Sequence, residues 1–161
     1  MKTAIVVGNP KAKSRTLDAA LLIATKLTGQ PPDSVFDLVD FGPALLEFGN
    51  AAVAAAITVV RQADTLIVAS PTFKATYTGL LKLFLDQFPP DGLAGVTAFP
   101  VMLGAGPAHA LAPELSLKPV LVELGAICPA VGLYLIDKSF AEDPALDKWV
   151  ARAKPLLRAR S

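Results

Sequence analysis

Cysteine and histidine are almost absent from this chain of 161 residues, which contains one of each. Cys128 has no partner for an intrachain disulfide, and together with His109 it cannot supply a zinc ligand set, so we expect no metal site. Long apolar runs are missing as well. The longest, residues 51–60, is about half of the ~20 residues that a membrane span requires. The apolar stretch at residues 4–7 is too short for the core of a signal peptide. We therefore expect a cytoplasmic protein with no membrane association.

An excess of charge of either sign is also lacking. Fifteen Lys and Arg residues stand against fourteen Asp and Glu residues, which gives a formal net charge of +1. This balance argues against a nucleic-acid binder and against a polybasic membrane module. Because 53% of the residues are apolar, the chain can bury a substantial core, and its length favours one domain over residues 1–161.

Several catalytic and nucleotide-binding motifs do not occur. There is no Gly-x-Ser-x-Gly nucleophile elbow, no Walker motif and no glycine triplet of a dinucleotide turn. A phosphoacceptor module would need acidic residues after the first and third strands, but those positions hold Gly8-Asn9 and Ala69-Ser70. A hydrolase, a nucleoside triphosphatase and a phosphoacceptor are therefore disfavoured.

The sequence does contain regular alternation of strand and helix patterns. Short apolar runs predict strands at residues 3–8, 34–41, 64–70, 96–103 and 127–136. Helical spacing predicts helices at residues 16–28, 50–63, 78–88, 108–125 and 144–158, with a bend or break at Pro113 and Pro119. The alternation indicates an α/β three-layer sandwich with a parallel sheet covered by helices on both faces.

The helices at residues 78–88 and 108–125 carry more apolar residues than one buried stripe requires. Because a helix on a sheet buries only one face, we expect the remaining apolar surface to contact another subunit. The sequence therefore predicts a homo-oligomer, either a homodimer or a homotetramer.

Ligands of open parallel sheets bind beyond the carboxyl ends of the strands, so the loops after the strands are the candidate sites. The first such loop combines an amide, hydroxyls and cations at the start of a helix, where an anion is favoured: Asn9, Lys11, Ser14, Arg15 and Thr16. A phosphate monoester would suit this loop. Alternatively, Ser14 or Thr16 caps the helix and the cations are solvated.

Two further loops could complete a site. The segment Pro71, Thr72, Phe73 and Lys74 offers polar backbone and one aromatic ring, which suits a planar heteroaromatic ligand. The loop Gly104, Ala105 and Gly106 would let a ligand approach the backbone closely. Each segment taken alone also fits a simple turn. The hypothesis of a ligand site therefore rests on the combination of the three loops.

These residues resemble the NADPH-dependent FMN reductases, a family of flavodoxin-like fold, over nearly the whole chain. The resemblance rests on Gly8-Asn9-Pro10 with Ser14-Arg15-Thr16, on residues 70–79 with Leu81-Lys82, and on residues 117–121. It implies a five-stranded sheet in the order 2-1-3-4-5. It also implies FMN and NADPH or NADH as cofactors, with a partner monooxygenase that receives reduced flavin.

The resemblance further implies the roles of the loops. The loop at residues 9–16 would hold the FMN phosphate, residues 71–74 would lie along the flavin ring, and residues 104–106 would contact its edge. Asn9 stands where serine is usual, Phe73 where tyrosine is usual, and Ala105 where a second glycine is common. Some members linked to monooxygenases carry an extra tyrosine in the fourth helix, which residues 112–117 lack.

Hydride transfer from NAD(P)H to flavin needs positioning rather than a protein nucleophile, so no catalytic side chain is predicted. Two other functions are compatible with the same fold. One is a quinone or azo reductase with resident FMN, and the other is a non-enzymatic electron carrier of the flavodoxin type. Such carriers are usually strongly acidic, whereas this chain is close to neutral.

Overall fold

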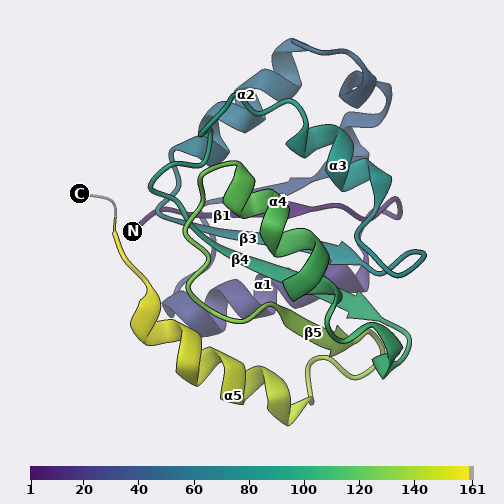
Figure 1. Ribbon diagram of the computed structural model, residues 1–161, viewed down its shortest axis with the longest axis vertical. Coiled ribbons are helices and arrows are strands. Elements are labelled where there is room, and N and C mark those ends of the chain that lie inside the picture. Colours follow the sequence, from purple (N-terminus) through teal and green to yellow (C-terminus); the bar gives the residue numbers. More distant parts are fainter. Residues whose placement is uncertain (160–161) are drawn as a thin grey trace.

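Five parallel strands form one sheet in the computed structural model, which describes residues 1–159 (Figure 1). The strands are β1 (Thr3–Val7), β2 (Ser34–Asp37), β3 (Thr65–Pro71), β4 (Thr97–Gly104) and β5 (Leu133–Ile136). Their order is β2-β1-β3-β4-β5, and each neighbouring pair is parallel. The predicted order 2-1-3-4-5 is confirmed.

Helices cover both faces of this sheet (Figure 1). They are α1 (Arg15–Thr28), α2 (Ala51–Arg61), α3 (Gly79–Leu85), α4 (Lys118–Glu123) and α5 (Pro144–Ala153). Alternate strand residues point to opposite faces. Ile5 and Val7 of β1 thus lie in one core with α1 and α5, while Ala4 and Val6 lie in a second core with α2, α3 and α4. No helix among residues 1–159 combines the length and apolarity needed to cross a membrane.

Local capping defines α1, which begins one residue before its predicted start. The Ser14 hydroxyl accepts the Leu17 N–H (3.3 Å), so it satisfies one donor of the first turn. Gly29 ends the helix in the left-handed conformation, with φ +76°, and its N–H donates to Thr25 O (2.8 Å). Sequence signals at both ends were therefore sufficient to place this helix.

Several predicted elements are shorter than expected. The strand expected at residues 34–41 ends at Asp37 and continues as a 3₁₀ segment, Leu38–Leu46. The single helix expected at residues 108–125 is a 3₁₀ turn (Pro107–His109), a π-helix (Pro113–Leu117) and α4. The interruption lies at residues 110–111, before Pro113. From residue 112 to 123 the helical backbone is continuous, with π-type hydrogen bonds over Pro113–Leu117 and no break at Pro119.

The helices at residues 78–88 and 144–158 were also predicted too long. The first ends at Leu85, ahead of the Pro89-Pro90 turn. The second ends at Ala153, where a 3₁₀ turn that contains Pro155 follows. In both cases a nearby proline cannot continue the pattern of backbone hydrogen bonds.

The strand expected at residues 127–136 is wrong over its first half. Ile127 still pairs with the neighbouring strand, since Ala98 N–H donates to Ile127 O (2.8 Å). Alternate residues of a parallel strand direct their N–H groups to the same neighbour, so Pro100 faces that side without a donor. The chain leaves the sheet at residues 128–132, and pairing resumes only where Val101 lies opposite Leu133.

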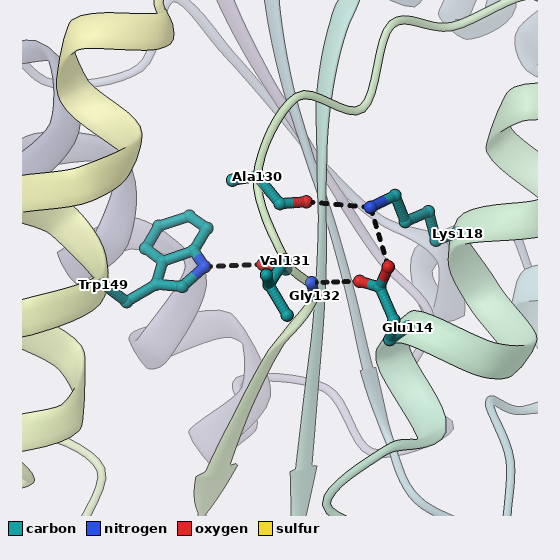
Figure 2. Close-up of polar contacts among 6 residues, drawn as sticks. All are labelled: Glu114, Lys118, Ala130, Val131, Gly132 and Trp149. Atoms are coloured by element: carbon teal, nitrogen blue, oxygen red, sulfur yellow. Dashed lines mark hydrogen bonds and ion pairs between the residues drawn. The ribbon is translucent and has the colours of Figure 1, made fainter.

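Side chains from two helices hold the segment that leaves the sheet (Figure 2). From one side, Glu114 accepts the Gly132 N–H (2.7 Å) and Lys118 Nζ donates to Ala130 O (3.1 Å). From the other side, Trp149 Nε1 donates to Val131 O (2.7 Å). These bonds satisfy backbone donors and acceptors of a segment that has no partner strand among residues 1–159.

Candidate functional site

One cavity of about 410 Å³ lies at the carboxyl ends of β1, β3 and β4, where the sequence placed the site. Residues from all three predicted loops line it: Asn9, Lys11, Ser14, Arg15, Thr16, Pro71, Thr72, Phe73, Gly104 and Ala105. Of the predicted site residues, Lys74 and Gly106 do not line it. The three segments, far apart in sequence, therefore line one cavity.

Close packing of β1 against α3 sets the course of the first loop. A Cβ on Gly8 would lie 2.4 Å from the Leu81 Cβ, so only glycine fits here. The Thr78 hydroxyl, which caps α3, donates to Gly8 O and accepts the Leu81 N–H. The start of α3 and the end of β1 are thus held together next to Asn9, the first residue of the loop that lines the cavity.

Within the first loop, some polar side chains form hydrogen bonds that hold the loop, and others remain exposed to solvent. Asn9 Nδ2 donates to Thr16 Oγ1 (3.0 Å), and Asn9 Oδ1 accepts the Lys11 N–H (2.9 Å). Ser14 and Thr16 are buried, and Ser14 caps α1 as the alternative interpretation held. Lys11 and Arg15 remain exposed beside the first turn of α1, where backbone N–H groups lack intrahelical acceptors. This arrangement favours an anion.

The second loop projects as a two-residue hairpin. Phe73 N–H donates to Thr76 O (2.9 Å), and Thr76 N–H donates to Phe73 O (3.3 Å). The turn residues Lys74 and Ala75 both have positive φ, at 49° and 73°. Phe73 is 51% exposed at the cavity, so its ring is available to a ligand.

Thr72 provides a direct test of whether a polar ligand fits. Its N–H donates to Leu103 O (2.7 Å), which fixes its backbone at the end of the sheet. Its Oγ1 is buried, and among residues 1–159 it has no hydrogen-bond partner. A buried hydroxyl without a partner costs free energy, and a polar ligand atom in this cavity would remove that cost.

Tyr134 of β5 supports the third loop from behind. Its hydroxyl donates to Gly106 O (2.7 Å). A Cβ on Gly104 would lie 1.9 Å from the same hydroxyl oxygen, so glycine is required beside it. Gly106 therefore does not line the cavity, but its carbonyl anchors the third loop to Tyr134.

Sequence reasoning left several lining residues out of the predicted site: Lys13, Asp18, Leu103 and Asp137. Asp137 follows β5, so the rule that placed the other loops would have indicated it too.

Lys13 has φ +51°, and its N–H donates to Asp37 Oδ2 (3.3 Å) at the end of β2. Burial raises the pKa of Asp37, while this hydrogen bond opposes the shift and nearby Asp40 adds to it.

Cys128 lies away from this cavity, in the segment that leaves the sheet. Burial raises the pKa of its thiol to about 11, so the thiol stays protonated near neutral pH. An inert thiol was the interpretation favoured from the sequence, although its position in a buried strand was wrong.

Comparison with known proteins identifies the family of this chain. The family model of the NADPH-dependent FMN reductases matches residues 1–141. The chain belongs to this family. An "FMN reductase (NADPH)" of Escherichia coli K12 is 35% identical over 130 residues, which are 78% of this chain and 68% of the relative.

Two further proteins that are similar to this chain extend the comparison. An "NADH-dependent FMN reductase SfnF" of Pseudomonas fluorescens Pf0-1 is 27% identical over 150 residues, 88% of this chain and 80% of the relative. A solved NADH:FMN oxidoreductase, in its apo form, superimposes with a TM-score of 0.85 at 32% identity, covering 97% of this chain and 87% of that one.

The predictions of a flavodoxin-like fold, an FMN reductase activity and FMN with NAD(P)H as cofactors are confirmed at the level of the family. The residues that contact flavin stay a prediction.

Proposed function

We propose that FMN binds in the 410 Å³ cavity and is reduced there by NADPH or NADH. The observation that carries this proposal is the convergence of three loops, each predicted separately, on that one cavity. When bound, FMN supplies the ring that takes up a hydride from the nicotinamide. No protein nucleophile is needed, so the contribution of this chain is binding and orientation.

Each group of lining residues has a distinct role in the proposal. Lys11, Arg15 and the first-turn N–H groups of α1 bind the phosphate, because both the side chains and the helix dipole favour negative charge. The unpaired Thr72 hydroxyl bonds a polar atom at the ring edge. The exposed ring of Phe73 lies against the flavin and limits its movement.

The test is a flavin titration combined with an assay of NADPH and NADH oxidation, with and without added FMN. We expect Lys11→Gln to raise the KM for FMN about tenfold with little change in kcat, since one charge-assisted contact is lost. Lys26→Gln is the matched control, because Lys26 lies at the other end of α1 and pairs with Asp147. Equal effects of the two substitutions would contradict a phosphate site at Lys11.

The same assay separates the alternatives. Turnover with quinones but without free flavin would favour a quinone or azo reductase with resident FMN. Failure to oxidise either nicotinamide nucleotide would favour an electron carrier.

We also propose that the chain forms a homo-oligomer. Three apolar side chains of the segment at residues 108–125 are more than half exposed: Leu111, Leu115 and Val122. Their exposure supports an apolar contact with another subunit there. Residues 78–88 lend less support, since Leu80 and Leu83 pack against the core. Delivery of reduced FMN to a partner monooxygenase and a cytoplasmic location stay predictions that rest on the sequence.

A further inference from the structure

An acidic side chain lies at the end of the cavity where we propose that the FMN phosphate binds. Arg15 Nη2 is 2.7 Å from Asp137 Oδ2, and both side chains line the cavity. Arg15 is the first residue of α1, whereas Asp137 directly follows β5. The guanidinium of Arg15 therefore already has a carboxylate partner.

The sheet holds Asp137 in this position. Its N–H donates to Gly104 O (2.9 Å), one step beyond the pair Gly104 and Ile136 that ends the β4–β5 ladder. Its side chain is 25% exposed, against 57% for Arg15. The long arginine can reorient towards a ligand, but the short, anchored aspartate stays beside the cavity.

Charged side chains of both signs line the cavity. The lining cations are Lys11, Lys13 and Arg15, and the lining acids are Asp18 and Asp137. Of these acids, Asp137 is the one in direct contact with a lining cation. A carboxylate and a phosphate use the same fork of guanidinium donors, so they compete for it, and their like charges repel.

We propose that Asp137 weakens binding of the FMN phosphate, because its carboxylate competes for the Arg15 guanidinium and repels the phosphate charge. The inference rests on the proposed binding of FMN in this cavity. Asp137 is a positioning and specificity residue here, because it acts through Arg15 and through its charge and takes no part in hydride transfer.

The decisive experiment measures the binding of FMN and of riboflavin, which lacks the phosphate, to the wild type and to Asp137→Asn. Asparagine keeps the shape and the backbone bond to Gly104 but removes the charge. We expect the Kd for FMN to fall about three- to tenfold at low salt, with a smaller change at high salt. The Kd for riboflavin should not change.

Two further variants control the interpretation. Asp147→Asn removes an equally charged side chain that pairs with Lys26 (2.8 Å) away from the cavity, and it should leave both affinities unchanged. In an Arg15→Gln background, Asp137→Asn should have a clearly smaller effect on FMN, because the guanidinium for which phosphate and carboxylate compete is gone.

The outcomes separate this inference from the proposed function. Wild-type protein that binds FMN, with Asp137→Asn leaving its affinity unchanged or lower, would overturn the role of Asp137 alone. A gain for riboflavin equal to that for FMN would also overturn it, since the effect would not involve the phosphate. Absence of FMN binding in the wild type and all variants would overturn the proposed function and this inference with it.

Discussion

Gly104 and Tyr134 show how a single residue on a buried strand can shape the cavity. The Tyr134 hydroxyl occupies the space that a Cβ on Gly104 would need and bonds Gly106 O. We expect Gly104→Ala to destabilise the fold by about 1–3 kcal/mol, because the tyrosine must move and lose its hydrogen bond. Tyr134→Phe, which removes only the bond, should cost about 1 kcal/mol.

Urea unfolding of both variants and of the double variant would check this prediction. Because the Tyr134→Phe substitution removes the oxygen nearest to the new methyl group, the double variant should lose less stability than the sum of the single changes. Additive losses would mean that the two residues do not act through one contact. The Kd for FMN should rise in Gly104→Ala, since the backbone at the cavity moves with Tyr134.

At the scale of secondary structure elements, the Phe73–Thr76 hairpin is a strained element beside the cavity. Ala75, with φ +73°, occupies a backbone region that residues other than glycine adopt at a cost of about 1–2 kcal/mol. We therefore expect Ala75→Gly to stabilise the fold by about 1 kcal/mol, as measured by urea unfolding.

Ala55→Gly provides the matched control for the hairpin, because Ala55 is an exposed residue inside α2. The same substitution there should destabilise the fold by about 1 kcal/mol, since glycine is a poor helix former. Loss of stability in both variants would contradict the assignment of strain to Ala75. The extra freedom of a glycine turn should also weaken FMN binding, because Phe73 would be less well oriented.

For the whole molecule, the exposed apolar side chains predict self-association. Leu115 and Leu46 are each 68% exposed, but only Leu115 belongs to the segment at residues 108–125. We expect Leu115→Glu to lower the mass measured by sedimentation equilibrium, because a buried charge in an interface is costly. Leu46→Glu should leave the mass unchanged, and the reverse result would place the contact elsewhere.

Local pattern was sufficient for much of this protein. The uninterrupted apolar run of β1 and the Ser14 and Gly29 caps of α1 each act over a few residues, so sequence alone places them. The rule that ligands bind beyond the carboxyl ends of parallel strands then indicated the loops that line the cavity. These features depend on backbone preferences and hydrophobic periodicity, which neighbouring residues determine.

Tertiary structure decided what depends on contacts between distant residues. The 128–132 segment leaves the sheet because Pro100, on another strand, offers it no donor, and side chains of Glu114, Lys118 and Trp149 hold it instead. The pairing of Asp137 with Arg15 likewise arises only when β5 is placed beside β4. Such contacts join residues far apart in the chain, and no local periodicity records them.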